Sequence, residues 1–505
     1  MAVNLADENT DLDLENKLSR LWRGEALRVV DLFSGCGGMS LGLKRAGYTI
    51  LGGVEINPNA TSTYAANLFK GVDRNTFELH NTPHDITTFT PEMFLHEILQ
   101  AEHPENLVDV IAGGPPCQAF SRIGRAKLRA VRQDPQAFLT DERSNLYLQY
   151  LAYVEFFRPL AVLMENVPDI MNYGGVNIAE EIAISLEELG YRCSYTILNA
   201  AHYGVPQLRQ RLYLIAILDA LDLEPCFPEP TDYIRVPSGY ESAHFVALST
   251  IERDLFHTVR YTDPPQPGNT LPTTVTVREA LADLPPITAH LQGQMQRGIR
   301  KFDTLASYVQ GIELSTYACW MREWPGFESH EGVWDHVVRS LPRDYPIFQR
   351  MKHDDQYPQA HQIARELFQE KLRTYQEQLG MDIHEDSEVY QDLLKKTVPP
   401  YKVDRFPNKW WKLNPDQPSR TLTAHMGKDT YSHIHYDSGQ ARVISVREAA
   451  RLQSFPDGFQ FAGAMNSAFT QIGNAVAPLQ AYALGSHIRQ LLLTAARQIY
   501  EIVSL

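Results

Sequence analysis

The stretch Leu27-Arg28-Val29-Val30-Asp31-Leu32-Phe33-Ser34-Gly35-Cys36-Gly37-Gly38 decides the fold. Its first seven residues predict a buried strand, and a helical pattern from Met39 to Arg45 follows the glycines directly. Strand, glycine turn and helix form the opening unit of a cofactor-binding α/β fold. The glycines let the backbone approach a ligand with no side chain in between. Because the spacing differs from the dinucleotide pattern GxGxxG, the turn needs support from the rest of the chain.

A second predicted strand, Ile50 to Val54, supplies that support because it ends at Glu55. An acid at the tip of the second strand, about 20 residues after the glycine turn, is placed to accept hydrogen bonds from a ribose. Capping of a helix is the alternative role for Glu55. A predicted helix from Ala60 to Phe69 and a further acid, Asp85, come next in the chain.

Cys117 is a thiol at the mouth of a predicted strand, in a chain that has few cysteines. The apolar run Leu107 to Ala112 predicts a buried parallel strand, and Gly113-Gly114-Pro115-Pro116 must end it and turn the backbone sharply. In open α/β sheets ligands bind at the carboxyl ends of the strands, so a nucleophile at this position has a substrate within reach. The alternative is a small apolar core cysteine after a turn.

The next predicted strand, Leu160 to Met164, ends at Glu165. Neighbouring parallel strands lie about 4.8 Å apart, so the carboxylate and the Cys117 thiol can converge on one bound group. Further on, Arg209 and Arg211 alternate in Gln207-Leu208-Arg209-Gln210-Arg211 at the entrance of a strand, which predicts that both side chains share one face. An exposed basic edge strand is the alternative for this pair.

The composition is that of a globular protein with two or three domains' worth of sequence in 505 residues. No window of about 18 uninterrupted apolar residues predicts a membrane span, and the acidic N-terminus lacks the pattern of a secretory signal. Five cysteines are scattered without the spacing of a zinc site, and they indicate an intracellular thiol protein without a disulfide framework or a metal.

The formal net charge of -15 does not by itself indicate a nucleic-acid partner. Local charge is more informative, because five bases follow Cys117 before the first acid, Asp134. Such a cluster predicts phosphate neutralisation beside the thiol, and a solvated loop is the alternative. The five bases are Arg122, Arg125, Lys127, Arg129 and Arg132.

Five motifs in order resemble those of the DNA (cytosine-5)-methyltransferase family, bacterial type. A chance match to one motif is easy, whereas a match to five in sequence order is not. The motifs cover about 28–218 and 418–490, and they are Asp31-Leu32-Phe33-Ser34-Gly35-Cys36-Gly37-Gly38, Gly114-Pro115-Pro116-Cys117-Gln118, Glu165-Asn166-Val167, Gln207-Leu208-Arg209-Gln210-Arg211 and Gln471-Ile472-Gly473-Asn474-Ala475-Val476.

The resemblance implies an α/β fold, a Rossmann-like S-adenosylmethionine-dependent methyltransferase sheet with a second, smaller target-recognition domain. The implied division is an acidic N-terminal extension over 1–27, a catalytic domain over 28–290 and 418–505, and a target-recognition domain over 291–417. The 200 or so residues between the two halves are too many for a connection and enough for a domain. The short N-terminal extension leaves no room for a large regulatory domain before the first motif.

The resemblance also assigns site residues. Cys117 would be the nucleophile, Glu165 would hold a proton at the base, and Arg209 and Arg211 would brace the base, the carboxylate or a phosphate. The cofactor would be S-adenosyl-L-methionine, with no metal. Its pocket would be formed by Phe33, Gly35, Gly37, Glu55, Ile56, Asp85, Pro115, Leu146, Asn474 and Val476.

The middle region contains two readable segments. Gln362 to Leu379 predicts an amphipathic helix. In Lys409-Trp410-Trp411-Lys412 the aromatic pair is more often core than a nucleic-acid contact, and core is the prediction here. A third segment, Ser445 to Ser454, predicts a structural helix beside the last motifs.

The function implied is methyl transfer to carbon 5 of a flipped-out cytosine in a specific duplex DNA sequence, in restriction-modification or phage defence. The expected partner is double-stranded DNA, and the chain is expected to be a cytoplasmic, nucleoid-associated monomer without membrane contact. A tRNA cytosine-5 methyltransferase shares the fold but usually has a short middle region. A non-catalytic DNA-binding homologue would have no chemical need for Cys117, Glu165 and both arginines together.

Overall fold

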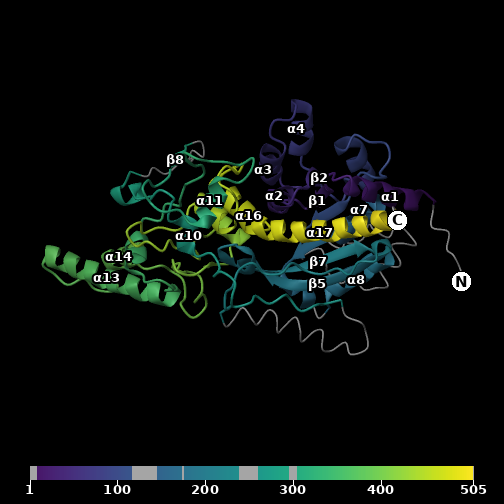
Figure 1. The fold of residues 1–505 in the computed structure, drawn as a ribbon. Helices are drawn as coiled ribbons and strands as arrows, with labels where there is room; N and C mark the ends of the chain where they lie inside the picture. Colours follow the sequence, from purple (N-terminus) through teal and green to yellow (C-terminus); the bar gives the residue numbers. More distant parts are fainter. Residues whose placement is uncertain (1–7, 117–144, 173–175, 238–259, 295–303, 504–505) are drawn as a thin grey trace. The chain divides into compact units, whose positions relative to one another are not determined.

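The computed structural model describes residues 8–116, 145–172, 176–237, 260–294 and 304–503. The chain forms two compact units, of which unit 1 comprises Met1–Thr274 and Ala475–Leu505 and unit 2 comprises Val275–Asn474 (Figure 1). Unit 2 is therefore inserted into the sequence of unit 1. Residues 275–290 and 418–474, which belong to the predicted catalytic domain, lie in unit 2. The functional division of the chain remains a prediction.

Unit 1 is built on a six-stranded sheet in the order β2-β1-β3-β4-β7-β5. The first four strands run parallel, and β7 is antiparallel to both of its neighbours. This mixed sheet with flanking helices confirms the predicted α/β fold class. The six strands of this sheet are β1 (Arg28–Leu32), β2 (Thr49–Val54), β3 (Val110–Gly113), β4 (Ala161–Asn166), β5 (Tyr191–Asn199) and β7 (Gln210–Leu218), and the short strand β6 (Gln207–Leu208) lies outside it.

Each predicted strand and helix of unit 1 is present, with bounds shifted by a few residues. β3 begins at Val110, three residues later than predicted, because the backbone of Asp109 bonds to Arg28, Leu160 and Ala161 at the strand's start. The main helices are α1 (Glu8–Trp22), α2 (Gly38–Arg45), α3 (Pro58–Leu68), α4 (Arg74–Asn81), α5 (Pro91–Met93), α7 (Asn145–Phe157), α8 (Ile178–Glu188) and α17 (Pro478–Val503).

The long helix α17 returns from the far side of unit 2 in the sequence to complete unit 1 (Figure 1). A Cβ atom on Gly42 of α2 would lie 2.3 Å from the carbonyl oxygen of Pro478, so glycine is what lets the two backbones approach. On the sheet, the hydroxyl of Tyr213 donates to Oε1 of Gln480 at 2.9 Å. The sheet and the two ends of unit 1 thus share one apolar core.

The segment predicted as an acidic N-terminal extension contains α1, which packs into unit 1. Lys17 is buried, and its Nζ donates to the carbonyl oxygens of Phe157 and Arg158 at 3.2 and 3.0 Å, at the end of α7. Arg20 is also buried and pairs with Asp109 at 2.6 Å. Two basic side chains therefore fix this helix to the sheet and to α7.

Unit 2 is mostly helices and turns. The amphipathic segment predicted from Gln362 is α13, which starts five residues earlier, where Pro358 at a first-turn position begins the helix. Within the described residues no helix is both long and apolar enough to span a bilayer. The elements of unit 2 are α10 (Val277–Leu281), β8 (Ala306–Ser307), α11 (Thr316–Arg322), β9 (Gly332–Val333), α12 (Tyr345–Arg350), α13 (Tyr357–Leu379), α14 (Glu388–Thr397), β10 (Ser419–Arg420), α15 (Val446–Leu452) and α16 (Met465–Asn474).

Three arginines on or next to α15 are fully buried in unit 2. Arg451 binds Asp283 through two bonds of 3.0 Å and Asp457 through bonds of 2.5 and 2.6 Å. Arg442 forms two bonds of 2.7 Å with Glu448. Arg447 donates to three backbone carbonyl oxygens as well as to Asp335. The segment predicted as a structural helix, Ser445 to Ser454, is therefore the centre of an ionic core.

A second cluster in unit 2 is aromatic. Trp410 is fully buried and stacks on Tyr431, with ring centroids 4.6 Å apart and planes within 2°. The core prediction for this tryptophan is confirmed. Trp411 is half-buried, and the guanidinium of Arg420 lies 4.8 Å from its ring centroid. The tandem aromatics thus divide between the interior and the surface.

Candidate functional site

The glycine-rich loop after β1 has the conformation that its sequence predicts. Phe33, Gly35 and Gly37 have φ values of 58°, 54° and 91°. A Cβ atom on Gly37 would lie 2.9 Å from side-chain atoms of Leu68 and Tyr64, so this position excludes any larger residue. The loop therefore presents backbone at the carboxyl end of β1, where a ligand can approach it.

Glu55 is joined to this loop. Its Oε2 accepts the backbone N–H of Gly35 at 2.9 Å, and its Oε1 accepts that of Asn57 at 2.8 Å. Burial raises the pKa of the Glu55 carboxyl, and the backbone N–H groups oppose this effect. The N-cap of α3 is Asn57, so the helix-cap alternative for Glu55 does not hold. Ile56, the next residue, is 62 % exposed beside this carboxylate.

Asp85 lies next to the same strand end. The backbone N–H of His84 donates to the carbonyl oxygen of Glu55 at 2.8 Å, which fixes the Asp85 turn beside β2. One carboxylate oxygen of Asp85 accepts the backbone N–H and the hydroxyl of Thr87 at 2.9 and 2.8 Å. The glycine loop, Glu55 and Asp85 are thus brought together at one edge of the sheet.

Glu165 and Pro115 come together at the ends of β4 and β3. Gly113 pairs with Met164 in the parallel register, and the side-chain Nδ2 of Asn166 donates to the Pro115 carbonyl oxygen at 2.7 Å. A Cβ atom on Gly114 would lie 3.1 Å from Oε2 of Glu165, so the glycine leaves room for this carboxylate. Cys117 itself, together with the basic segment around it, lies outside the described residues.

The buried carboxylate of Glu165 pairs with Arg211, whose Nε lies 2.9 Å from Oε1. The two groups form an ion pair at this distance, yet Oε1 accepts no hydrogen bond with good geometry from a described residue. One oxygen of the carboxylate is therefore only partly satisfied. Such an oxygen can accept a further hydrogen bond.

Arg209 departs from the strand geometry predicted for it. The chain breaks between β6 and β7 at this residue, because its N–H bonds to Gln207 and its carbonyl oxygen to Ala200. Arg209 is 1 % exposed, and its Nη2 donates to the Ala475 carbonyl oxygen at 3.0 Å. Burial and the neighbouring Arg211 lower the pKa of Arg209 to about 9. The exposed-edge alternative is wrong for this residue.

The three remaining predicted cofactor residues are Leu146, Asn474 and Val476. Val476 is buried in the core of unit 1, and Leu146, in the first turn of α7, is packed against that core. Asn474 is an exposed residue at the end of α16 and the last residue of unit 2. The last motif thus spans the boundary between the units, and the role of Asn474 in the cofactor pocket remains a prediction.

The sequence analysis did not single out Asp31 as part of this site. The Asp31 carboxylate, buried beneath the loop, accepts the Ser40 hydroxyl at 2.5 Å, and the Tyr64 hydroxyl lies 3.3 Å from that hydroxyl. Burial raises the Asp31 pKa to about 7. An acid inside an otherwise apolar strand is the signal that identifies it. Its bond to α2 fixes the start of that helix beneath the loop.

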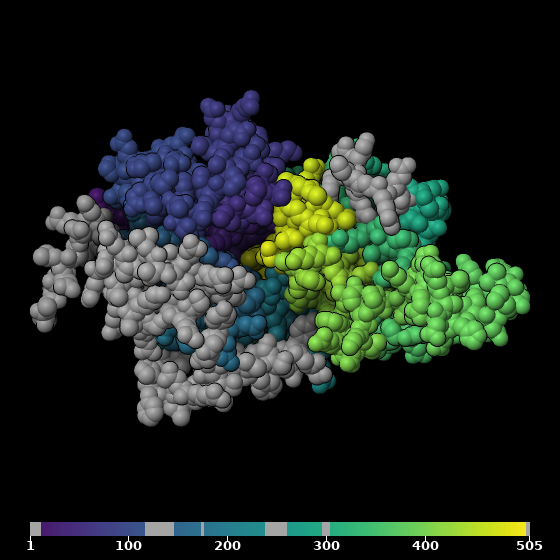
Figure 2. Space-filling model, turned by 180° about the vertical axis from the view of Figure 1, so that it is seen from behind, coloured from purple at the N-terminus to yellow at the C-terminus, as the bar shows by residue number. Residues whose placement is uncertain are grey.

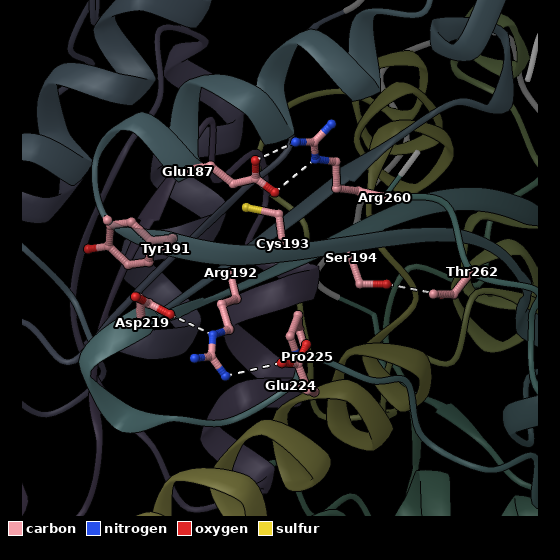
Figure 3. Close-up of a pocket in the computed structure, with 11 residues that line it drawn as sticks. Glu187, Tyr191, Arg192, Cys193, Ser194, Asp219, Glu224, Pro225, Arg260 and Thr262 are labelled. Atoms are coloured by element: carbon pink, nitrogen blue, oxygen red, sulfur yellow. Dashed lines mark hydrogen bonds and ion pairs between the residues drawn. The ribbon is translucent and has the colours of Figure 1, made fainter. Parts of the chain in front are cut away.

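A polar pocket of about 500 Å³ lies elsewhere on unit 1, at the β5 edge of the sheet (Figure 3). Its two arginines are already neutralised, since Arg260 pairs with Glu187 at 2.6 Å and Arg192 with Asp219 at 2.5 Å. The segment Arg260 to Thr262 runs along part of this edge by bonding to Tyr195. No predicted site residue lines the pocket, so the candidate site is the one at the carboxyl ends of β1 to β4.

Comparison with known proteins defines the class. The family model of the C-5 cytosine-specific DNA methylases matches residues 27–490. The chain belongs to this family, and it is a DNA (cytosine-5-)-methyltransferase. The family's activity is methyl transfer to DNA.

Individual relatives agree with this assignment. The chain is 37 % identical over 463 residues to the protein named "Putative type II methyltransferase M.OihORF3336P" of Oceanobacillus iheyensis, covering 92 % of this chain and 95 % of the relative. It is 29 % identical to the type II methyltransferase M.AgeI of Thalassovita gelatinovora, covering 92 % and 99 %. The crystal structure of an E. coli prophage DNA modification methyltransferase shares the fold, with a TM-score of 0.55 and 21 % identity over 92 % of this chain and 99 % of that one.

Proposed function

We propose that the chain transfers the methyl group of S-adenosylmethionine to carbon 5 of a cytosine flipped out of a specific duplex, through a covalent adduct with Cys117. The observation that carries the proposal is the arrangement at the ends of β3 and β4. Asn166 holds the Pro115 carbonyl oxygen at 2.7 Å, two residues before Cys117, and Glu165 lies 3.1 Å from a Cβ position on Gly114. Pro115 and the partly satisfied carboxylate of Glu165 therefore lie at adjacent strand ends, and Cys117 follows Pro115 by two residues in the sequence.

The chemistry requires these two groups. Carbon 5 of cytosine is a poor nucleophile, and addition of the Cys117 thiolate at carbon 6 makes carbon 5 enamine-like. The electron pair of carbon 5 forms the bond to the methyl group, and the sulfonium donor leaves as neutral S-adenosylhomocysteine. Water then takes the proton from carbon 5, and expulsion of the thiolate restores the aromatic ring. The products are the methylated base, S-adenosylhomocysteine and one proton, with the Cys117 thiolate regenerated, so atoms and charge balance.

Glu165 would hold a proton at ring nitrogen 3 during the addition. The carboxylate is positioned for this by Arg211 at 2.9 Å and by the strand pairing of Glu165 with Tyr213 of β7. The buried Arg209 adds a second positive charge close to the carboxylate. Both arginines would also favour the thiolate form of Cys117.

The residues around the glycine loop fit S-adenosylmethionine. When bound, this group supplies an electrophilic methyl on a sulfonium. Backbone at Gly35 and Gly37 leaves room for its approach, the Glu55 carboxylate can accept from ribose hydroxyls, and Asp85 can accept from the adenine amino group. The exposed side chain of Ile56 offers an apolar surface beside Glu55.

The DNA partner follows from the same chemistry. A cytosine inside a duplex cannot present its ring faces to a thiol, so it must leave the stack at a cost of a few kcal/mol. The basic segment Ser121–Thr140 would close on the duplex, and the region 291–417 would read the sequence. The relatives' type II names support a role in restriction-modification. Such a role places the enzyme with the cell's DNA in the cytoplasm.

Transfer of labelled methyl to duplex DNA and to tRNA tests the proposal. We expect label in unmethylated genomic DNA and none in tRNA. Cys117→Ala should abolish transfer, because the covalent step is lost, while cofactor binding stays near the wild-type value. Cys226→Ala, at an exposed cysteine away from the strand ends, is the matched control. Label in tRNA alone, or Cys117→Ala activity within about tenfold of wild type, would overturn the proposal.

Bisulfite sequencing of DNA from a host that expresses the chain would identify the modified sequence. A chimera that takes residues 300–415 from a relative of different specificity should then adopt the donor's sequence. Base readout requires side chains delivered to a groove, and the five motifs lie outside this region. A folded chimera that still methylates the original sequence would contradict the target-recognition assignment.

A further inference from the structure

Lys402–Lys409, called the cationic turn below, is a compact exposed segment of unit 2. The backbone N–H of Phe406 donates to Lys402 at 3.3 Å, and that of Lys409 donates to Phe406 at 3.2 Å. Tyr357, at the start of α13, anchors the turn by donating to the Pro407 carbonyl oxygen at 3.2 Å. The turn is therefore held in one conformation with its apex exposed.

Phe406 stands at this apex and is 50 % exposed. It makes no ring contact with the aromatic cluster around Trp410, although that cluster lies only four residues further along the chain. A single exposed apolar side chain is common in proteins. The exposure of Phe406 alone therefore does not indicate a binding partner, and the charges around it are the further observation.

The surroundings are mainly basic, although the turn also carries one exposed acid, Asp404. Lys402 and Arg405 are exposed and form no ion pair within the described part of the chain. Lys409 pairs with Asp429, which ties the segment carrying the exposed Lys428 to the turn. Lys402, Arg405 and Lys428 are thus three cations without a carboxylate partner among the described residues. They lie on two segments joined by the Lys409–Asp429 pair, and Phe406 is on the first of these segments.

Arg420 reinforces the arrangement from a further segment. Its Nη1 donates to the Asn408 carbonyl oxygen at 3.2 Å, while its guanidinium lies over the half-buried ring of Trp411. The bond to Asn408 fixes the far side of the turn. The ring contact places a further positive charge beside an aromatic face.

The hairpin of α13 and α14 provides the contrast within unit 2. The two helices form the green surface at one end of unit 2 in Figure 2. The segment from Glu377 to Val389, which contains the connection between them, has five acids and no lysine or arginine. DNA phosphates would be repelled by this connection and attracted by the cationic turn. The two surfaces of unit 2 therefore differ in the partner that their charge allows.

We propose that the cationic turn is a duplex-contacting element, in which Lys402, Arg405 and Lys428 bind phosphates and Phe406 enters a groove to pack against a base step. Apolar wedges amid bases are used in this way by proteins that deform DNA. The inference rests on the proposed function, because it takes duplex DNA as the substrate. It adds the residues with which unit 2 grips that substrate.

The phosphate contacts are tested by the salt dependence of DNA binding. The probe is an oligonucleotide duplex that carries the sequence mapped by bisulfite sequencing. Lys402→Ala with Arg405→Ala should lower the slope of log affinity against log salt by about 2, since each phosphate contact contributes about 0.9. Lys395→Ala with Lys396→Ala, two exposed lysines on α14, should leave the slope unchanged. An equal slope for wild type and the turn variant would overturn the phosphate assignment.

Phe406 is tested separately. Phe406→Ala should weaken binding of the same duplex by about tenfold or more at an unchanged salt slope, the scale of one lost stacking contact. Phe406→Leu should retain most of the affinity, because leucine also serves as a wedge. Tyr375→Ala removes a similarly exposed ring, 46 % exposed on α13, and should have no effect. If the Phe406→Ala variant binds the duplex with wild-type affinity, the assignment of Phe406 as a wedge is wrong.

The two proposals fail in distinguishable ways. A wild-type chain that transfers no methyl to duplex DNA contradicts the proposed function, whatever the turn does. A chain that methylates DNA normally, while the turn variants bind like wild type, contradicts only the cationic turn. Turn variants that change the sedimentation of the chain and not its DNA binding would assign the turn to a second copy, and they would overturn the inference too.

Discussion

The sheet of unit 1 and the segment around α15 in unit 2 fill their interiors with different side chains. In unit 1 the strands β3 and β4 are buried at every position, and all but the last two residues of β4 are apolar or glycine. In unit 2 the largest fully buried side chains include Arg442, Arg447 and Arg451. Apolar burial is non-directional, whereas a buried charge must keep its partners in place. Unit 2 should therefore be the unit that a single change or a change of pH disrupts first.

The largest expected effect is on the Arg451 network. Arg451→Ala leaves Asp283 and Asp457 buried without their main partner, which should lower the free energy of unfolding of unit 2 by about 3–5 kcal/mol. Tryptophan fluorescence in urea measures this, because five of the six tryptophans lie in unit 2. A loss below about 1 kcal/mol would show that the ionic core is not what stabilises unit 2.

An apolar truncation in unit 1 should cost less. Leu163→Ala in β4 removes a fully buried side chain between Ala112 and Ile215 and should destabilise unit 1 by about 3 kcal/mol, through lost burial and a cavity. Hydrogen exchange of sheet peptides measures this loss. Equal loosening of unit 2 peptides would contradict the view that the two units have independent cores.

Acid should also change the stability of the two units differently. Burial lowers the pKa of both His433 and His435 to about 3, so below their usual pKa the unfolded chain binds protons that the folded chain does not. Stability is full above about pH 6.5 and falls on acidification, by about 2 kcal/mol for each histidine at pH 5. Urea titrations at pH 5 and pH 8, followed by fluorescence, measure the loss.

Asp31 gives the stability of unit 1 the opposite dependence on pH. Burial raises its pKa to about 7, so the folded state holds this proton more tightly, and stability rises as the pH falls from 7 towards 4. Hydrogen exchange of β1 peptides at the same two pH values reports this effect, and Asp31→Asn should flatten it. If both units lose stability in parallel at pH 5, the contrast in their interiors has no consequence for acid sensitivity.

The smallest effect is expected at the surface of unit 2. Arg350 forms two bonds of 2.8 and 2.7 Å with Glu370, but both side chains are nearly half exposed. Arg350→Ala should therefore cost less than about 1 kcal/mol, because an exposed ion pair contributes little. The same urea titration serves as the control for Arg451→Ala. A loss as large as that of Arg451→Ala would mean that burial does not decide the strength of these pairs.

The contrast also explains how much could be predicted from the sequence. In unit 1 the local pattern was sufficient for β1, the glycine loop, β2 and the acid Glu55, since strand, turn and helix signals act over a few residues. The burial of Arg209 could not be predicted, because its guanidinium donates to the Ala475 carbonyl oxygen 266 residues away. The helix pattern of α15 could be predicted, but the partners of its arginines could not.

The same limit applies to the candidate site. The spacing of motifs predicted that the ends of β3 and β4 meet, and the hydrogen bond from Asn166 to Pro115 agrees with this. Local patterns did not reveal that Gly114 leaves room for the Glu165 carboxylate, nor that Asp31 holds Ser40 beneath the loop. Both features depend on three-dimensional proximity, and a glycine or an acid alone carries no distance information.

The helix α17 has a consequence for synthesis of the protein. It follows unit 2 in the chain, yet Gly42 packs against its first turn and Tyr213 of the sheet donates to its Gln480. Ribosomes add about 5–20 residues per second, so unit 2 emerges and can fold while unit 1 still lacks this helix. A nascent chain therefore exposes part of its sheet core until translation has passed Val503. The core of unit 1 can therefore be completed only after α17 has been made, although most of its sheet is synthesised before unit 2.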